Sequence, residues 1–170
     1  MAFSVEKDGD GDIRLRVSYR SGNKDTAEIA KGYLDRFIDY AWKNSPLRGK
    51  AWQADFSWIS RTGVIEEPYL TDQVKQKLDL HAHTFIRNLS RISETSLKSS
   101  RGIILSGPPG CGKTMAIKAM IESYPDMTFI VMTSEHLQRR CVHTIYDIAR
   151  RLAPSVVVLE DIDSAGGLSR

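Results

Sequence analysis

Hydrophobic and polar residues alternate in patterns that predict one strand and two helices in the first 92 residues. Residues 13–19 alternate apolar with polar or charged side chains at a period of two, which is typical of a half-buried strand. Residues 25–45 carry apolar side chains three, four and seven positions apart, and the pattern ends before Pro46. This spacing predicts an amphipathic helix. A similar pattern predicts a second helix over residues 71–92.

Between Pro46 and Pro68 the sequence has no regular period, which predicts a loop-rich segment. Its large apolar residues are Trp52, Phe56, Trp58 and Ile59. We expect these side chains to anchor the segment in the core, because large apolar residues are mostly buried. A binding surface is the alternative that this pattern leaves open.

Strand-like and helix-like patterns alternate in the second half of the chain. The predicted strands cover residues 101–106, 127–132 and 155–159, and the predicted helices cover residues 115–122 and 134–152. The run at 155–159 is apolar and β-branched, as expected of a central parallel strand. Strands that alternate with helices predict an α/β fold with a parallel sheet.

Composition and charge restrict the class of protein. The 170 residues carry a net charge of +3, and basic residues alternate with acidic ones, which disfavours a nucleic-acid partner. Two cysteines, Cys111 and Cys141, form no disulfide framework and fit a reducing compartment. No apolar run is long enough for a signal peptide or a membrane span. We therefore expect a soluble, cytoplasmic protein with no membrane partner.

Two groups of residues invite a metal interpretation that the spacing disfavours. The acidic run at residues 8–12 would place Ile13 and Tyr19 where a calcium-binding EF-hand loop needs glycine and glutamate. His81 and His83 are two positions apart on a predicted helix, and so point about 200° apart around its axis. Solvated or hydrogen-bonded histidines are the better interpretation.

Residues 107–114 match the phosphate-binding pattern G-x-x-x-x-G-K-[ST], between a predicted strand and a predicted helix. They are Gly107, Pro108, Pro109, Gly110, Cys111, Gly112, Lys113 and Thr114. The glycines permit the left-handed backbone that turns N–H groups inward around an anion. Lys113 would reach the β- and γ-phosphates, and the Thr114 hydroxyl would hold Mg²⁺. With Met115, these residues predict a site for ATP or ADP.

Two adjacent acids follow the apolar run at residues 155–159. Because ligands of parallel sheets bind at the carboxyl ends of the strands, we expect Glu160 and Asp161 to face the phosphate loop. One carboxylate would bind the Mg²⁺ shell and its neighbour would orient the attacking water. The two acids are therefore the candidate catalytic residues.

Three separated motifs resemble the AAA family of ATPases. Residues 107–114 resemble GPPGTGKT with Cys111 in place of threonine, residues 148–155 look like A-R-x-x-x-P, and residues 159–163 look like D-E-I-D. Arg170 falls near an arginine that is frequent in the family. The resemblance covers about residues 68–170.

This resemblance implies a fold, a cofactor and partners. The fold would be an AAA-type P-loop parallel sheet with flanking helices, incomplete in residues 68–170, after a small α+β segment at residues 1–67. That N-terminal segment would bind an adaptor or substrate, or would be structural. The implied activity is hydrolysis of ATP with Mg²⁺ by a homo-oligomeric ring, such as a hexamer, that remodels a protein client.

The chain also departs from the family pattern. The order of the acids is reversed, so that by register Glu160 takes the Mg²⁺-linked position and Asp161 the water-activating one, while the opposite assignment stays open. Residues 133–140 contain no aromatic residue, which argues against threading of a polypeptide through a pore. The family's strand order is 5-1-4-3-2, in which the strand before the phosphate loop is the first and lies between the fourth and the fifth. If the resemblance holds, we expect the fourth and fifth strands beyond Arg170. Residues 103–105 would then have no strand neighbours unless another strand, such as residues 13–19, covers them.

Two alternatives follow from these departures. The first is a nucleotide-binding switch or scaffold with little turnover, which the reversed acids favour. The second is a loader-type AAA protein that acts on DNA, which the near-neutral charge disfavours.

Overall fold

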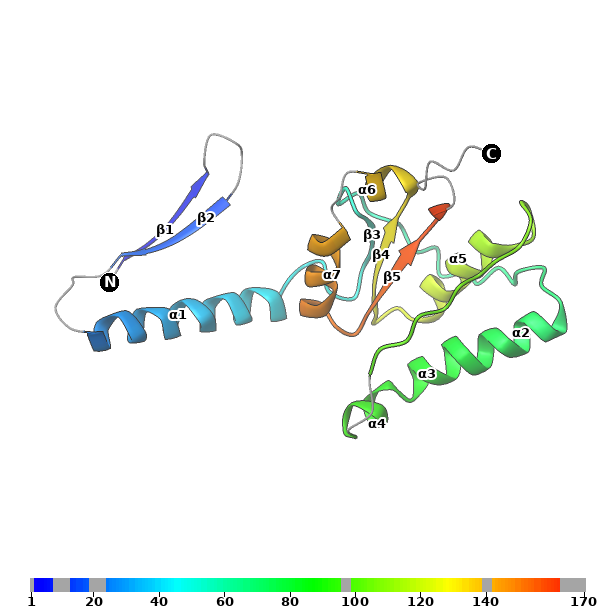
Figure 1. The fold of residues 1–170 in the computed structure, drawn as a ribbon, viewed down its shortest axis with the longest axis horizontal. Helices are drawn as coiled ribbons and strands as arrows, with labels where there is room; N and C mark the ends of the chain where they lie inside the picture. The colour runs from blue at the N-terminus through cyan, green and yellow to red at the C-terminus, as the bar shows by residue number, and fades with distance from the viewer. Residues whose placement is uncertain (1, 8–12, 19–23, 96–98, 139–141, 163–170) are drawn as a thin grey trace.

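The N-terminal part of the fold is a two-stranded hairpin followed by a long helix. The computed structural model describes residues 2–7, 13–18, 24–95, 99–138 and 142–162 of the 170. Strand β1 (Ala2–Lys7) pairs antiparallel with β2 (Ile13–Ser18), and helix α1 (Lys24–Lys43) follows. Figure 1 shows this part extending to one side of the remaining structure. The predicted strand and helix are confirmed, whereas β1 was not predicted; residues 8–12 and 19 lie outside the described part.

A three-stranded parallel sheet forms the centre of the fold. Its order is β3 (Ala51–Gln53), β4 (Thr128–Met132) and β5 (Ser155–Leu159), with β4 in the middle. Two of the three strands predicted in the second half of the chain, β4 and β5, are confirmed, and they are neighbours, as the resemblance to the AAA family implies. Strand β3 was not predicted, because three residues are too few to show a period. It lies within residues 1–67, yet it pairs with β4.

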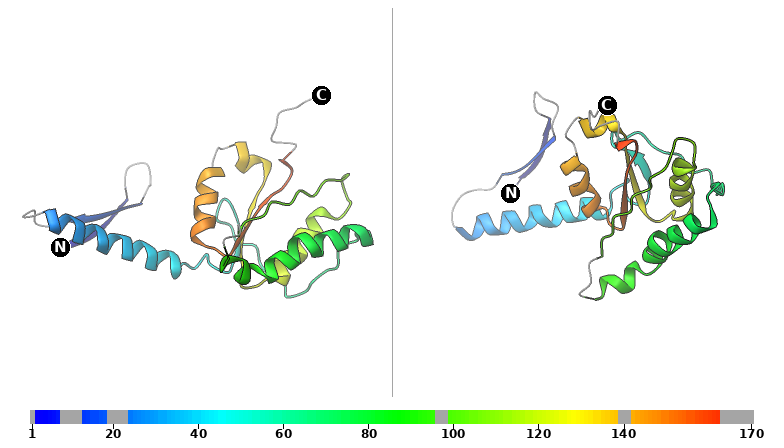
Figure 2. Two further views of the ribbon diagram at one scale, coloured as in Figure 1. Left: turned by 60° about the horizontal axis from the view of Figure 1, so that its bottom comes forward. Right: turned by 45° about the vertical axis from the view of Figure 1, so that its right-hand side comes forward.

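Helices cover both faces of this sheet (Figure 2). Helix α7 (Val142–Arg151) packs on the face of β4 that carries Ile130 and Met132. Helix α5 (Lys113–Ser123) packs on the opposite face, which carries Phe129 and Val131. The alternation of side chains along β4 therefore assigns each helix to one face.

The predicted helix at residues 71–92 is present but is divided into four segments. These are α2 (Asp72–Leu78), the π-helical turn η1 (Asp79–His83), α3 (Thr84–Arg87) and α4 (Leu89–Ser93). Instead of the single helix predicted at residues 134–152, the structure has α6 (Ser134–Gln138) and α7, separated by residues outside the described part.

The predicted strand at residues 101–106 is wrong as a sheet strand. This segment pairs with no strand in the part of the chain that the structure describes, and Ile104 is 84% exposed. An apolar run becomes a strand only where a neighbouring backbone accepts its hydrogen bonds. Strand β2 does not supply that neighbour, since it pairs with β1. Residues 103–105 thus lack strand neighbours, as the AAA strand order implies.

The expectation for the aromatic residues after Pro46 is right for only one of them. Trp52 is fully buried, but Phe56 and Trp58 are more than half exposed. The chain turns back tightly after β3: Phe56 adopts a left-handed φ of 67°, and Trp58 forms an antiparallel bridge with Trp52. This turn places the Phe56 ring at the surface, stacked on Trp52 with centroids 5.3 Å apart.

We predict that stability depends on β4 and not on the exposed apolar run. Replacing the fully buried Ile130 with Ala should lower the free energy of unfolding by about 2–5 kcal/mol, through lost burial and a cavity. Replacing the exposed Ile104 with Ala, a chemically identical change, should cost less than about 0.5 kcal/mol. Urea denaturation of both variants measures this. Equal costs would show that the sheet is not the centre of stability.

Candidate functional site

The loop before α5 has the backbone that its glycines predict. Gly110 and Gly112 have left-handed φ values of 75° and 90°, and Gly112 is the N-cap of α5. A Cβ atom on Gly112 would lie 3.3 Å from Leu70 Cδ2 and 3.4 Å from the carbonyl oxygen of Tyr69. The phosphate-loop pattern therefore packs directly against residues 69–70, and Gly112 is required both for its φ and for this close approach.

The side chain of Lys113 lies over this loop. Its Nζ donates hydrogen bonds to the carbonyl oxygens of Gly107 at 2.7 Å and Pro108 at 2.9 Å, and lies 3.7 Å from Cys111 Sγ. Thr114 is exposed and Met115 is partly buried at the first turn of α5. The residues predicted to bind phosphate thus form one continuous loop and helix N-terminus, and the Lys113 ammonium is hydrogen-bonded to the loop.

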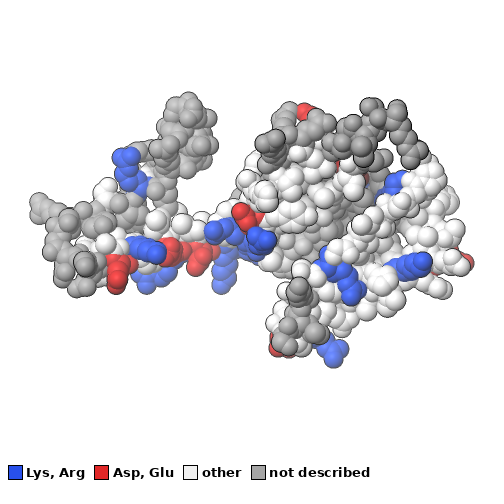
Figure 3. All heavy atoms as spheres, in the orientation of Figure 1, with Lys and Arg blue, Asp and Glu red and all other residues white. Residues whose placement is uncertain are grey.

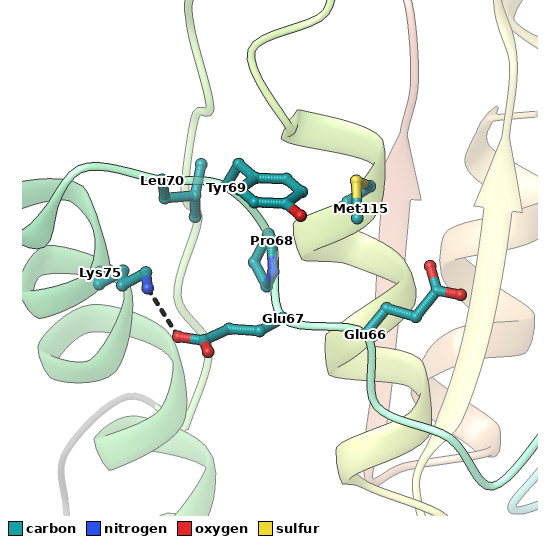
Figure 4. Close-up of a pocket in the computed structure, with 7 residues that line it drawn as sticks. All are labelled: Glu66, Glu67, Pro68, Tyr69, Leu70, Lys75 and Met115. Carbon is teal, nitrogen blue, oxygen red and sulfur yellow. Dashed lines mark hydrogen bonds and ion pairs between the residues drawn. The ribbon is translucent and has the colours of Figure 1, made fainter.

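Beside the loop is an open hollow of about 550 Å³ (Figure 4). Its lining residues are Glu66, Glu67, Pro68, Tyr69, Leu70, Lys75 and Met115. Tyr69 is 91% exposed, and Figure 4 shows its ring between Leu70 and Met115. Sequence reasoning included Met115 but missed the other six residues, because an irregular stretch without a motif carries no signal of its spatial neighbours.

One edge of the hollow carries an ion pair. Lys75 Nζ donates to Glu67 Oε1 at 2.6 Å. This hydrogen bond lowers the pKa of Glu67 and raises the pKa of Lys75. Both groups are therefore charged at neutral pH, and they offer a donor and an acceptor side by side.

The two acids after β5 lie in different surroundings. The Glu160 N–H donates to the Met132 carbonyl oxygen at 2.8 Å, which continues the pairing of β5 with β4. Burial raises the pKa of the Glu160 carboxyl, the neighbouring Asp161 raises it further, and Lys118 on α5 opposes both. Asp161 is exposed and has a left-handed φ of 52°, an uncommon conformation for a residue other than glycine.

The structure brings the acids and the loop to the same edge of the sheet. Figure 1 shows the carboxyl end of β5 and the beginning of α5 at the same end of the molecule. Among the described residues, no hydrogen bond or ion pair joins Glu160 or Asp161 to residues 107–115. Asp163 and Arg170, which belong to the motifs, lie outside the described part of the chain.

The donor set fits a magnesium ion that is shared with phosphate. Within the described ranges, no three His, Cys, Asp or Glu side chains are grouped to hold a metal by themselves. Mg²⁺ in phosphate-binding sites takes only one or two protein oxygens, with the remainder from phosphate and water. The Thr114 hydroxyl and the Glu160 carboxylate suit that role.

Within the part of the chain that the structure describes, the two histidines considered as metal ligands do not share a partner. His83 forms a hydrogen bond with Tyr124, which is consistent with the interpretation of a hydrogen-bonded histidine.

No helix in the described part of the chain is both long and apolar enough to cross a bilayer.

Comparison with known proteins finds one family model that matches the part of the chain that contains the loop and the acids. Residues 103–169 match the family described as "ATPase family associated with various cellular activities (AAA)". The chain is similar to the proteasome-activating nucleotidase of Thermococcus kodakarensis, with 28% identity over 117 residues, and to that of Sulfurisphaera tokodaii, with 36% identity over 88 residues. The nucleotidase of Pyrococcus abyssi is 34% identical over 80 residues. No solved structure matches the chain significantly.

These alignments cover limited parts of each protein. They include 61%, 48% and 43% of this chain, and 29%, 22% and 20% of the three nucleotidases in the same order. The chain thus spans less than a third of the length of the curated relatives that it matches. The family match begins in the exposed segment before the phosphate loop and extends beyond both acids.

We predict that the raised pKa of Glu160 makes this carboxylate a cost to stability at neutral pH. A folded-state pKa above the unfolded value means that folding takes up a proton, so that stability falls as pH rises through that window. Glu160→Gln should therefore raise the melting temperature at pH 7, and the difference should vanish near pH 4, where the carboxyl is protonated. Thermal melts from pH 4 to 8 measure this. A difference that stays constant across this range would contradict the assigned burial.

Proposed function

We propose that this chain, whose residues 103–169 belong to the AAA family of ATPases, binds ATP with Mg²⁺ and hydrolyses it within the full protein. The observation that carries the proposal is the loop of residues 107–112 at the N-terminus of α5, with the Lys113 ammonium held over it. We infer that the nucleotide lies along this loop, with its base in the hollow beside it.

The phosphate half of the proposed site depends on backbone geometry. Left-handed φ values at Gly110 and Gly112 allow successive N–H groups to point toward one anion. The N-terminus of the 11-residue helix α5 adds a partial positive charge. Phosphate oxygens would replace the Gly107 and Pro108 carbonyls as acceptors for Lys113, and would gain a charge-assisted bond.

The base half of the proposed site depends on the contact between the loop and residues 69–70. Because Gly112 packs against Tyr69 and Leu70, the hollow begins where the phosphate loop ends. The Tyr69 ring and Met115 offer apolar surface to the faces of an aromatic base. Glu67 and Lys75 offer an acceptor and a donor to its polar edge. A purine base suits this combination of apolar faces and a polar rim.

Two side chains would hold the cation and one would act on water. The Thr114 hydroxyl and the Glu160 carboxylate would bind Mg²⁺, which when bound neutralises charge on the phosphates. Asp161 is exposed beyond the end of β5, where its carboxylate can accept a hydrogen bond from water. We therefore assign the Mg²⁺-linked role to Glu160 and the water-activating role to Asp161.

The proposed role of the full protein is remodelling of a protein client by an ATP-driven homo-oligomeric ring, such as a hexamer, in the cytoplasm. Support comes from the AAA match and from the relatives, which are named as proteasome-activating nucleotidases. Figure 3 shows basic and acidic side chains interspersed along α1 on the face drawn. A mixed surface of this kind offers no continuous basic track for a nucleic-acid backbone.

A nucleotide-binding switch with little turnover is the second candidate. The observation that favours it is the pair of acids: the carboxylate in the metal-linked position is the one whose burial raises its pKa, and Asp161 is shorter than the glutamate usual in its place. A fixed water is harder to reach with a shorter side chain. Measured phosphate release by the full protein separates a switch from an ATPase.

We predict that nucleotide binding requires Lys113. Lys113→Ala removes a charge-assisted contact with phosphate and should weaken ATP binding about tenfold to over a hundredfold. Isothermal titration calorimetry measures the affinity. Lys77→Ala, which removes the same charge from an exposed position on α2, is the matched control and should change affinity by less than about threefold. If the two variants bind alike, the phosphate site has been assigned wrongly.

We predict that substitutions of the two acids have different effects on ATP hydrolysis by the full protein. Asp161→Asn should keep Mg²⁺–ATP binding while slowing phosphate release by about 100-fold or more, because the water loses its general base. Glu160→Gln should instead raise the Mg²⁺ concentration needed for half-maximal activity. Phosphate release measured over a magnesium titration distinguishes them. The reverse pattern would exchange the two roles.

A further inference from the structure

Residues 64–70, here called the strap, connect two fixed points along helix α5. At one end, the N–H of Gly63 donates to Glu122, which lies on the last turn of α5. At the other end, Leu70 packs against Gly112, the N-cap of the same helix. The strap therefore runs opposite to α5 in direction, and Figure 4 shows it between α2 and α5.

The strap is longer than the distance that it has to cover. From Gly112 to Glu122 the axis of α5 rises by roughly 15 Å, at about 1.5 Å per residue. The seven residues from 64 to 70 can extend to about 23–25 Å. Chain length alone therefore leaves the path of the strap open, and contacts with the rest of the protein must fix it.

Contacts along the middle of the strap are few. In the part of the chain that the structure describes, no backbone hydrogen bond joins residues 65–69 to another segment. Val64, Ile65 and Tyr69 are all more than half exposed, so apolar packing does not hold this stretch. The ion pair of Glu67 with Lys75 lies at the surface, where such pairs contribute little. Most of the restraint on the strap therefore comes from its ends.

Glu122 fixes the start of the strap with both oxygens of its carboxylate. Its Oε1 accepts from the Thr62 N–H at 2.8 Å, and its Oε2 accepts from the Gly63 N–H at 3.0 Å. The left-handed φ of 72° at Gly63 turns the two N–H groups to the same side, as in a backbone site for an anion. The bond from the Thr62 N–H is the main cause of the lowered pKa of Glu122, which is therefore charged at neutral pH. Two charge-assisted hydrogen bonds thus set the direction in which the chain leaves residue 63.

Arg61 holds the same end of the strap against the sheet. Its Nη1 donates to the Gly49 carbonyl oxygen at 2.9 Å, and its Nη2 donates to the Met127 carbonyl oxygen at 3.0 Å. The guanidinium carbon lies 6.0 Å from the centroid of the Phe129 ring, on the buried strand β4. Residue 61 is therefore fixed to the core, and the next two residues, bound by Glu122, turn the chain along α5.

We propose that Glu122 and Arg61 are positioning residues for the base of the nucleotide. By fixing the start of the strap, they hold Tyr69 beside the phosphate loop, so that the hollow is formed before a ligand arrives. Neither residue belongs to the loop itself, since Glu122 lies ten residues after Gly112. They should therefore affect binding of the base and not of the phosphates. This role rests on the proposed ATP site, whereas the path of the strap does not depend on any nucleotide.

Cleavage by a glutamate-specific protease, without nucleotide, tests whether Glu122 holds the strap. The protease cuts after Glu66 and Glu67, and only when the chain leaves its folded path. In Glu122→Gln, the amide oxygen can accept one N–H, but the amide nitrogen cannot accept the other. Cleavage in the strap should therefore be about two- to tenfold faster than in the parent protein. An unchanged rate would overturn the proposal.

Two further variants control for changes elsewhere. Glu28→Gln makes the same change at an exposed position of α1 and should leave the cleavage rate unchanged; an equal acceleration there would also overturn the proposal. Arg61→Lys keeps the charge but cannot bridge several carbonyls at once, and should accelerate cleavage as Glu122→Gln does. Melting curves show whether each variant is folded. If Arg61→Lys does not fold, the comparison of Glu122→Gln with Glu28→Gln decides.

Calorimetric titrations of the full protein with Mg²⁺–ATP and with inorganic tripolyphosphate test the effect on the site. Tripolyphosphate offers the phosphates without a base. Glu122→Gln should weaken ATP binding about two- to tenfold and change tripolyphosphate binding by less than about twofold. A general loss of folded protein would weaken both by the same factor. That result, or an unchanged affinity for ATP, would overturn the proposal.

Failure of the proposed ATP site is recognised separately, in the parent protein. If the parent binds neither ligand, the phosphate site has been assigned wrongly, and if it binds both equally tightly, the hollow takes no base. In both cases the role in base binding falls with the proposed site, while the protease rates still decide whether Glu122 fixes the strap.

Discussion

The described fold depends on the complete burial of β4. Its backbone pairs with β3 along one edge and with β5 along the other, so its donors and acceptors are used on both sides. All five of its residues are buried, with Phe129 and Val131 against α5, and Ile130 and Met132 against α7. An unpaired buried backbone group costs about 1–3 kcal/mol, so β4 forms only with both neighbours in place. That requirement carries over to the site, since the Met132 carbonyl also fixes the N–H of Glu160.

Sequence patterns predicted the elements whose burial is decided locally. Helix α1 and strand β2 were found from periodicity, and strands β4 and β5 from short apolar runs rich in β-branched residues. The run at residues 101–106 has three consecutive apolar residues at 103–105 and was predicted as a strand like β5, but it forms no sheet strand in the described structure. Hydrophobicity indicates that a segment tends toward burial, whereas a strand also needs a partner backbone, and no local pattern reports that partner. Strand β3 is the converse case: it supplies a partner backbone for β4, but its three residues are too few to be predicted from a sequence pattern.

In the candidate site, too, features that depend on the local sequence were predicted, whereas features that depend on contacts between distant segments were not. The backbone of the candidate phosphate loop was predicted from glycines at fixed spacing, while the binding of phosphate by its residues stays a prediction. The hollow was missed apart from Met115, because Tyr69 and Leu70 reach the loop through a contact with Gly112 that no spacing encodes. Glu160 and Asp161 follow directly after the end of β5, as the sequence predicted, and their roles stay a prediction. Glu160 is partly buried, whereas Asp161 is exposed and has a left-handed φ. This difference results from the backbone turn after β5, which the amino-acid sequence alone did not predict.

Residues 66–70, which form one wall of the hollow, have no secondary structure, so side chains must hold this part of the backbone. Arg61 supplies much of this restraint: its guanidinium donates to the carbonyls of Gly49, Pro125 and Met127 at 2.9, 2.5 and 3.0 Å. Glu122, on the last turn of α5, accepts from the N–H groups of Thr62 and Gly63. These bonds hold residues 61–63 against the end of α5 and the start of β4. The segment then needs only the contact at Gly112 to bring residues 66–70 to the phosphate loop, so the helix that carries Lys113 also positions the wall opposite it.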